Sequence, residues 1–198
     1  FYDNILVRRH GQSTSGFTKK SFNVDFNHGN RFRWREGEDE VKDVKWLTNW
    51  GDKTKTHNTM AHEIAALAGA GHHFAFPFRM QTNGSFYSVA DMVEDADDRW
   101  LERLGLAPDG ALYKMYNALT SASGNEKKTR ETEGTADLQA VVTGLAPSTA
   151  LDTRRRYAYD NLDLAACVSY FVGRNLTSDQ DHGHKNYYLY RDTPDTGE

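Results

Sequence analysis

The sequence has one cysteine, four prolines and no long hydrophobic run. A single cysteine excludes an intrachain disulfide framework, and the apolar residues around Cys167 favour a buried, inert thiol over a nucleophile. No stretch of about eighteen apolar residues is present, so we expect no membrane-spanning helix. The 24 basic residues are outnumbered by 28 acidic ones, which gives a net charge of −4. That balance argues against nucleic acid as the main partner.

The chain does have enough apolar residues for a sizeable core, since 38% of its 198 residues are hydrophobic. Apolar alternation and turn residues predict strands at residues 5–7, 21–26, 74–80, 86–93, 111–116 and 186–191. Helical periodicity predicts helices at residues 59–70, 95–104, 136–145 and 162–176. Strands dominate the first half and helices the second. The expected fold class is therefore α+β, with a small sheet-rich lobe and a helical lobe.

Three shorter segments lie outside this pattern. Residues 28–44 are charged and are expected to form a surface excursion, anchored by the packing of Phe32 and Trp34. The Asn-Gly pair at residues 83–84 predicts a tight hairpin turn. Residues 118–134 are rich in Ser, Thr, Lys and Glu, which predicts a mobile loop.

A small polar connection at residues 11–16 joins the first two expected strands. The glycines at its ends have the spacing of a P-loop, but Phe17 and Thr18 follow where that motif needs Lys and Ser/Thr. It is therefore not a Walker A site. Two interpretations remain: an ordinary hairpin with a solvated Lys19 and Lys20 pair, or a flexible loop over phosphates followed by a strand lysine, as in protein kinases.

Asp181 and Asn186 are separated by four residues, the spacing of the catalytic loop of protein kinases. In that loop the Asp orients and deprotonates the acceptor hydroxyl, while the Asn coordinates Mg²⁺. The pair falls between the helix expected at residues 162–176 and the strand expected at residues 186–191. That setting favours a catalytic loop over a chance spacing.

A metal-dependent hydrolase is an alternative, built on the cluster Asp179, Asp181, His182 and His184. The EF-hand template fails here, because Gly183 and Tyr190 stand at its fifth and twelfth positions. A zinc site would need further ligands, and the two histidines are more readily explained as ordinary loop residues.

Two glutamates have a structural and a functional interpretation. Glu63 lies on the expected helix, where a glutamate normally faces solvent. In a kinase-like lobe Glu63 would pair with the strand lysine. Glu94 opens an acidic run that is typical of a helix start. In a kinase-like fold this run falls where the two lobes join, next to the nucleotide.

Taken together, these stretches resemble the CotH kinase family, atypical protein kinases first associated with bacterial spore coats. Residues 10–14, followed by residues 19–22, are similar to the family's Arg-Gly-x-Ser-(Ser/Thr)…Lys-Lys opening. The most specific match is residues 181–190, which resemble its Asp-x-x-x-x-Asn-Tyr-Tyr-Leu-Tyr block. Further similar blocks lie at residues 45–47, 83–94 and 110–114 and at Asp52.

The resemblance implies a single kinase-like domain over residues 1–198, with an N-lobe of about 1–93 and a C-lobe of about 94–198. It implies transfer of a phosphoryl group from ATP to Ser or Thr of a protein substrate, with Mg²⁺ or Mn²⁺. It also suggests a bacterial coat or extracytoplasmic setting. Oligomeric state is not indicated.

The resemblance also implies roles for individual residues. Asp181 would be the catalytic base and Asn186 a metal ligand. Lys20, or else Lys19, would contact the phosphates. The other expected nucleotide-binding residues are Gly11, Gln12, Ser13, Glu63 and Glu94.

Two departures from the family pattern qualify these expectations. His10 stands where the family has Arg, which makes a positive charge near the phosphates pH-dependent. The family continues into a Trp-Asp-x-Asp segment that supplies the main metal ligand, and Glu198 precedes that segment. We therefore expect a fragment of a longer chain, nearly inactive by itself. The remaining alternative is an inactive kinase-like module with a binding or structural role in a coat or surface protein.

Overall fold

The chain divides into two units in the computed structural model, which describes residues 1–179 and 183–193. The first unit comprises Phe1–Ala66 and His72–Trp100, and the second comprises Leu67–Gly71 and Leu101–Glu198. The helix α2 (Asp98–Arg103) contains the point where the first unit ends and the second continues. The prediction of a single kinase-like domain with two lobes stays a prediction.

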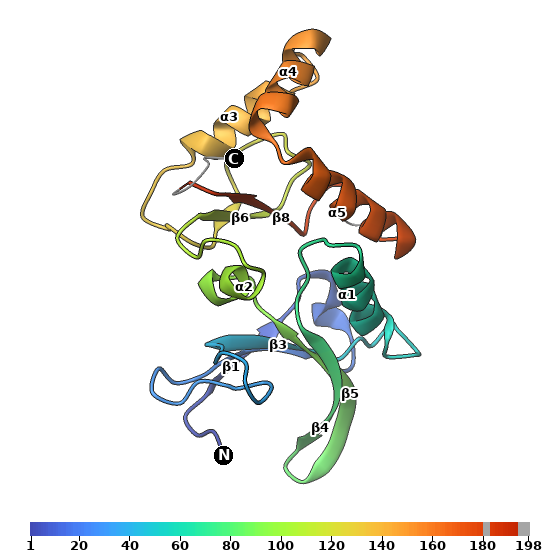
Figure 1. Cartoon of the computed structure of the whole chain (residues 1–198). Helices are drawn as coiled ribbons and strands as arrows, with labels where there is room; N and C mark the ends of the chain where they lie inside the picture. The colour runs from blue at the N-terminus through green and yellow to red at the C-terminus, as the bar shows by residue number, and fades with distance from the viewer. Residues whose placement is uncertain (180–182, 194–198) are drawn as a thin grey trace. The chain divides into compact units, whose positions relative to one another are not determined.

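A five-stranded antiparallel sheet forms the first unit, in the order β1-β2-β3-β5-β4 (Figure 1). The strands are β1 (Leu6–His10), β2 (Ser21–Asp25), β3 (Asp43–Leu47), β4 (Ala75–Thr82) and β5 (Ser85–Glu94). β1 lies at one edge, with Leu6 opposite Asp25 and His10 opposite Ser21. β3 was not predicted as a strand. It lies between β2 and β5, and its first two residues belong to the stretch expected to be a surface excursion.

The core of this unit lies on one face of the sheet, because alternate residues of a strand point to the same side. Its buried residues are Val24, Val41, Val44, Phe74 and Met92. Phe32 and Trp34 pack against this cluster, and the rings of Trp34 and Phe74 are stacked with centroids 4.4 Å apart. Residues 28–42 are thus anchored by the two aromatic residues that the sequence indicated.

The β4–β5 hairpin turns at Asn83 and Gly84, as predicted (Figure 1). Both residues have left-handed backbones, with φ of 49° and 79°. This conformation is the one that favours Asn-Gly in two-residue hairpin turns. The hairpin brings Ser85 and Thr82 opposite each other.

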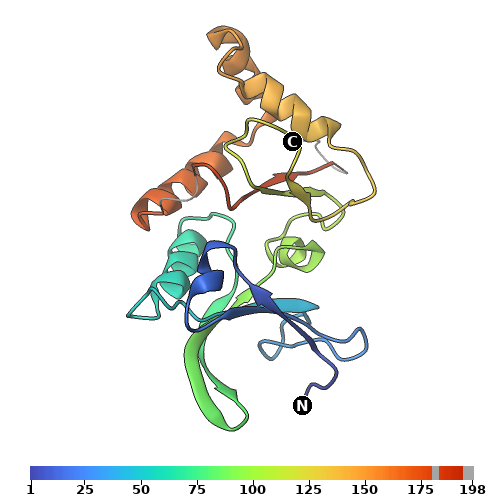
Figure 2. The same ribbon diagram turned by 180° about the vertical axis from the view of Figure 1, so that it is seen from behind.

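Two short helical segments complete the first unit. The helix α1 (His57–Leu67) follows β3 after a loop and starts two residues before the predicted position. A 3-10 turn, η1 (Ser13–Gly16), lies in the connection between β1 and β2. The two views show η1 next to α1, although they are far apart in the sequence (Figures 1 and 2).

The second unit has a three-stranded antiparallel sheet in the order β7-β6-β8. Its strands are β6 (Ala111–Met115), β7 (Glu126–Lys127) and β8 (Tyr187–Arg191). Its helices are α3 (Ala136–Leu145), α4 (Leu151–Asn161) and α5 (Leu164–Leu176). A second core cluster joins β6 to α3 through Tyr113, Met115 and Leu138. Asp163 caps α5 by accepting a hydrogen bond from the backbone N of Ala166.

Two features of this unit were not predicted from the sequence. Residues 118–134, expected to form a mobile loop, contain the two-residue strand β7, and buried Thr129 bonds both Leu112 N and Gly110 O at 2.8 and 2.6 Å. The helix α4 was missed because none of its residues is buried, so no apolar face marks it.

The predicted α+β class is confirmed. The described part of the chain contains the five-stranded antiparallel sheet, a smaller sheet and five α-helices, which is consistent with a small kinase-like fold. None of the helices in this part is both long enough and apolar enough to cross a bilayer.

Candidate active site

The connection between β1 and β2, here called the β1–β2 loop (residues 11–17), depends on a glycine. Gly11 has a φ of 98°, a backbone angle that residues other than glycine rarely adopt. A Cβ at this position would lie 2.0 Å from the Oγ1 of Thr14. The turn into η1 therefore requires Gly11 for both conformation and space. Gln12 and Ser13 follow it, and Gln12 O accepts a hydrogen bond from the Oγ of Ser15 at 2.7 Å.

Lys19 and Lys20 lie at the end of this connection, and both contact Tyr87 of β5. The backbone N of Lys20 donates to the hydroxyl of Tyr87 at 2.7 Å. The Nζ of Lys19 lies 4.6 Å from the centroid of the Tyr87 ring. Lys20 turns back to the loop, where its Nζ donates to Ser15 O at 2.7 Å. The sequence indicates the lysines, but no motif in it marks Tyr87.

The loop between β3 and α1, here called the β3–α1 loop (residues 48–56), holds the start of β2 from the other side. Thr48 is 1% exposed. Its backbone N donates to the Oγ of Ser21 at 3.1 Å, and its Oγ1 donates to the backbone O of Lys19 at 2.9 Å. The Nζ of Lys55 closes the loop by donating to Thr48 O and Asn49 O.

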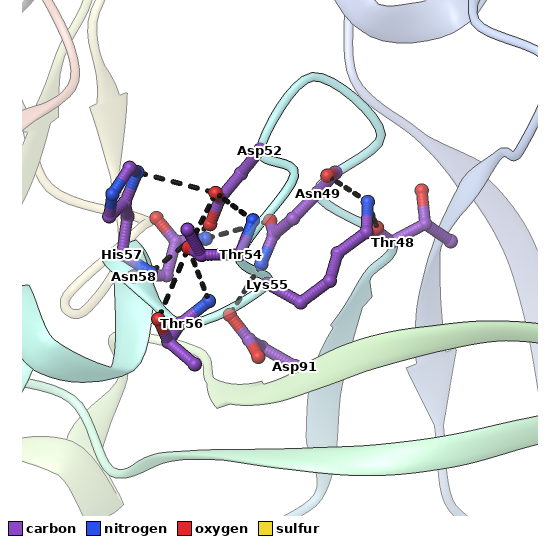
Figure 3. A network of polar contacts seen from close by, with 9 residues as sticks. All are labelled: Thr48, Asn49, Asp52, Thr54, Lys55, Thr56, His57, Asn58 and Asp91. Carbon is purple, nitrogen blue, oxygen red and sulfur yellow. Dashed lines mark hydrogen bonds and ion pairs between the residues drawn. The ribbon is translucent and has the colours of Figure 1, made fainter.

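Asn49 connects this loop to two further elements (Figure 3). Its Nδ2 donates to the Oδ2 of Asp91 on β5, and its Oδ1 accepts from the Nδ2 of Asn58 on α1 at 2.9 Å. Asn49 has a left-handed backbone with a φ of 45°. Asp91 is 0% exposed, and burial raises the pKa of its carboxyl above the ordinary value.

Asp52 fixes the start of α1. Its Oδ1 accepts hydrogen bonds from the N and Oγ1 of Thr54 at 2.9 and 2.7 Å, and its Oδ2 accepts from the N of His57 at 3.1 Å. Partial burial acts to raise the pKa of Asp52, but the hydrogen bonds from Thr54 and His57 outweigh it and lower the pKa to about 2. These bonds explain why α1 begins at His57.

A pocket of about 260 Å³ lies between the two loops, within the first unit. One side comes from the β1–β2 loop and its flanks: His10, Thr14, Phe17 and Ser21. The other comes from the end of β3, the β3–α1 loop and the start of α1: Leu47, Thr48, Asn49, Trp50, Gly51, Asp52, His57 and Asn58. On the second side His57 is bonded to Asp52 and Asn58 to Asn49, and the exposed rings of Phe17 and Trp50 add aromatic surface to the wall.

A second candidate lysine lies on β3, and sequence analysis gave it no role. The Nζ of Lys45 forms an ion pair with Asp95, and the two side chains are 14% and 19% exposed. Opposite Lys45 on β2, Asn23 has a buried Oδ1 without a hydrogen-bond partner among the residues that the structure describes. Protein kinases have their phosphate-contacting lysine on the third strand, so Lys45 competes with Lys20 for that role. The available signal was a lysine with apolar neighbours on both sides.

The two predicted glutamates differ in burial. Glu63 is exposed on α1, and the described part of the structure records no ion pair between it and Lys20. Glu94 is 2% exposed, and its Oε2 accepts from the backbone N of Phe74 at 3.2 Å on the core side of the sheet. This bond joins the residue before β4 to the end of β5, and the part of Glu94 in nucleotide binding stays a prediction.

Asn186 belongs to the second unit and lies immediately before β8. Its backbone N donates to the O of Met115 on β6 at 2.8 Å, and its φ of 61° turns the chain into the strand. Its side chain is exposed. The predicted setting is confirmed, because α5 precedes this segment and β8 follows it. Asp181, the proposed base, lies outside the described residues.

Only Asp179 and His184 of the metal cluster in the hydrolase alternative lie within the described residues. Asp179 forms an ion pair with Arg174, with Oδ2 and Nη1 2.9 Å apart. Within residues 1–179 and 183–193, no group of three or more His, Cys, Asp or Glu side chains is arranged to hold a metal ion. Asp181 and His182 lie outside those ranges. The thiol of Cys167 is half-buried, and burial raises its pKa, as expected for an unreactive cysteine.

A comparison with known families shows which family the chain belongs to. The family described as CotH kinase protein matches residues 7–197, almost the whole chain. The chain belongs to the CotH kinase family. A kinase-like function follows at the level of the family. No significant match was found among curated proteins.

Lys19 and Lys20, at the end of the connection that begins with Gly11, contact Tyr87 of β5 and Thr48 of the β3–α1 loop. Residues 8–20 contain two arginines, two lysines and His10, but no carboxylate. A segment of this charge, built around a required glycine, suits a phosphate ligand.

Proposed function

We propose that the intact protein transfers the γ-phosphoryl group of ATP to Ser or Thr of a protein substrate. The observation that carries the proposal is the glycine-dependent β1–β2 loop with a lysine pair at its end, in a chain of the CotH family. Gly11, Gln12 and Ser13 cover the phosphates, and Lys20 contacts them. Lys19 stays on the ring of Tyr87 and adds positive charge nearby.

Asp181 accepts the proton of the acceptor hydroxyl, and Asn186 provides an amide oxygen for the metal. The side chain of Asn186 is exposed and its backbone is held by a bond to Met115, which fits this role. When bound, Mg²⁺ or Mn²⁺ neutralises charge on the phosphates. For Lys20 to reach a phosphate, its Nζ must exchange the carbonyl of Ser15 for the ligand.

The test uses the full-length protein with γ-labelled ATP and Mg²⁺ or Mn²⁺. Label incorporation is compared among wild type, Asp181→Ala, Lys20→Ala and Lys45→Ala. Lys53→Ala is the matched control, since Lys53 is an exposed lysine of the β3–α1 loop. We expect Asp181→Ala to abolish incorporation and Lys53→Ala to leave it unchanged. Unchanged incorporation in Asp181→Ala would show that this residue is not the base.

The two lysine variants decide which strand supplies the phosphate contact. If Lys20 has that role, Lys20→Ala lowers ATP affinity and Lys45→Ala acts mainly on stability, through the loss of its ion pair with Asp95. If Lys45→Ala is instead the variant that lowers ATP affinity, the phosphate-contacting lysine lies on β3. A non-catalytic module is the other candidate function, and His10 permits it because an imidazole, whose charge depends on pH, stands in place of a permanently charged arginine. That candidate predicts nucleotide binding without label transfer in the wild type.

A further inference from the structure

We propose that Asn49 and Asp91 form a positioning pair that sets the start of β2, and so Lys19 and Lys20, relative to α1. The catalytic consequence of this pair rests on the proposed function, but its structural consequence does not. Neither residue belongs to the glycine loop or to the predicted catalytic loop. Both act through other residues.

The pair occupies the point where four segments meet (Figure 3). Asn49 follows β3 directly, receives a hydrogen bond from Asn58 of α1 and donates one to Asp91 of β5. The next residue back, Thr48, makes the two bonds to the start of β2. Displacement of Asn49 would therefore be transmitted through Thr48 to the backbone of Lys19.

The backbone of Asn49 explains why an amide side chain is present. Its left-handed φ is tolerated by Asn and Gly better than by other residues. Glycine would adopt this conformation more easily, but it would lose both the donor to Asp91 and the acceptor from Asn58. Asparagine at position 49 both tolerates the left-handed conformation and makes the two hydrogen bonds.

Packing alone would not require a carboxyl at position 91. Asp91 is fully buried, and the groups that stabilise its carboxylate by hydrogen bonding are two neutral side chains, the amide of Asn49 and the hydroxyl of Thr59. The cationic side chain of Lys55 is bonded to the carbonyls of Thr48 and Asn49 instead. Burial of a carboxyl is unfavourable unless hydrogen bonds compensate for it, so the bond from Asn49 offsets part of the cost of burying Asp91.

The first experiment separates the bonds from the backbone conformation in the full-length protein. Asn49→Gly keeps the left-handed backbone and removes both bonds. Asn83→Gly is the matched control, because Asn83 is a left-handed, exposed asparagine in the β4–β5 turn of the same unit. We expect Asn49→Gly, unlike Asn83→Gly, to raise hydrogen exchange at the amides of Lys20 and Thr48 by about tenfold or more.

The second experiment exchanges the partners. In Asn49→Asp two carboxyl groups face each other, and the donor to Asp91 is lost. In the double variant Asn49→Asp with Asp91→Asn, the amide at position 91 donates to the carboxylate at position 49, and Asn58 donates to its other oxygen. We expect the single variant to raise exchange at Lys20 and the double variant to restore protection to within about threefold of wild type.

The third measurement is the affinity for ATP under conditions in which all variants are folded. We expect Asn49→Gly to weaken binding by about tenfold and the double variant to recover it. Equal exchange in Asn49→Gly and Asn83→Gly overturns the positioning pair, and so does a failure of the double variant to restore protection. If the wild type binds no ATP, the proposed function fails, whereas the exchange comparison still decides the role of the pair.

Discussion

The two loops that enclose the pocket are built from contacts of different range. In the β1–β2 loop, the side-chain bonds join residues three and five positions apart, from Ser15 to Gln12 and from Lys20 to Ser15. In the β3–α1 loop, Thr48 bonds residues 27 and 29 positions away, and Asn49 bonds one 42 positions away. One loop is thus a local turn and the other is part of the tertiary structure.

This difference predicts how each loop responds to mutation. A local turn on the surface can change shape without unfolding the sheet, so its variants should alter ligand binding more than stability. A loop bonded to β2, β5 and α1 cannot change without affecting all three. Its variants should therefore lower the free energy of unfolding, and the effect should follow the burial of the group removed.

The largest effect on stability is expected from Asp91→Leu. This change leaves the Nδ2 of Asn49 without its buried acceptor, which should lower the free energy of unfolding by about 2–3 kcal/mol. Urea unfolding at neutral pH, monitored by tryptophan fluorescence, measures it. A loss below about 0.5 kcal/mol would show that the β3–α1 loop does not depend on this carboxyl.

Asp91→Asn is the matched variant, and it predicts a pH dependence. Burial raises the folded-state pKa of Asp91 above its ordinary value, so the folded state binds this proton more tightly than the unfolded chain. The stability that the protonated carboxyl contributes is complete below the ordinary pKa of 3.8 and is lost as pH rises through the folded-state pKa. Unfolding measured between acidic and neutral pH should show this decline in wild type and a smaller one in Asp91→Asn.

The next effect concerns ligand binding by the β1–β2 loop. In Gly11→Ala the new Cβ collides with Thr14 and the backbone must leave its left-handed conformation. We expect ATP affinity to fall by about tenfold, while the free energy of unfolding falls by no more than about 1 kcal/mol because the loop is exposed. Titration of a fluorescent ATP analogue and urea unfolding measure the two quantities.

Gly16→Ala provides the control for this prediction. No atom lies within 4 Å of a Cβ added at Gly16, and its φ is not left-handed. It should bind ATP like wild type. Wild-type affinity in Gly11→Ala would contradict the assignment of this loop to the phosphates.

The contrast between the loops also explains which helices, strands and turns could be predicted from the sequence and which could not. The Asn-Gly turn, β6, β8 and α3 were predicted within one or two residues, because turn residues or apolar periodicity mark them locally. The helix α4 and the strand β3 were missed because the first has no buried residue and the second was hidden in a charged stretch.

The same limit applies to the site. The spacing of Gly11 and Lys20 lies within one short connection, so the sequence alone indicated it. Asn49 and Asp91 are separated by 42 residues, and nothing local to either one indicates the other. Roles for Glu63 and Glu94 were assigned from their expected place in a kinase-like lobe and stay predictions, because the orientation of a side chain on a helix or strand depends on the tertiary packing.

A smaller loss of stability is expected from Asp52→Asn. The amide has one acceptor oxygen, so it cannot replace all the bonds that Asp52 accepts from Thr54 and His57, which should cost about 1 kcal/mol at neutral pH. Because the folded-state pKa of Asp52 is lowered to about 2, the wild-type stabilisation is present above 3.8 and is lost as pH falls toward 2. The two proteins should therefore converge in stability under acid conditions, as measured by urea unfolding.

The smallest effect should come from Ser15→Ala in the β1–β2 loop. The hydroxyl of Ser15 is exposed and, within the described part of the chain, bonds the nearby carbonyl of Gln12, and water can replace either partner. We expect the free energy of unfolding to change by less than about 0.5 kcal/mol. The affinity for ATP should also stay unchanged, since Lys20 bonds the backbone carbonyl of Ser15 and not its side chain. A loss of more than about 1 kcal/mol would mean that the local turn is coupled to the sheet, and the distinction between the two loops would then fail.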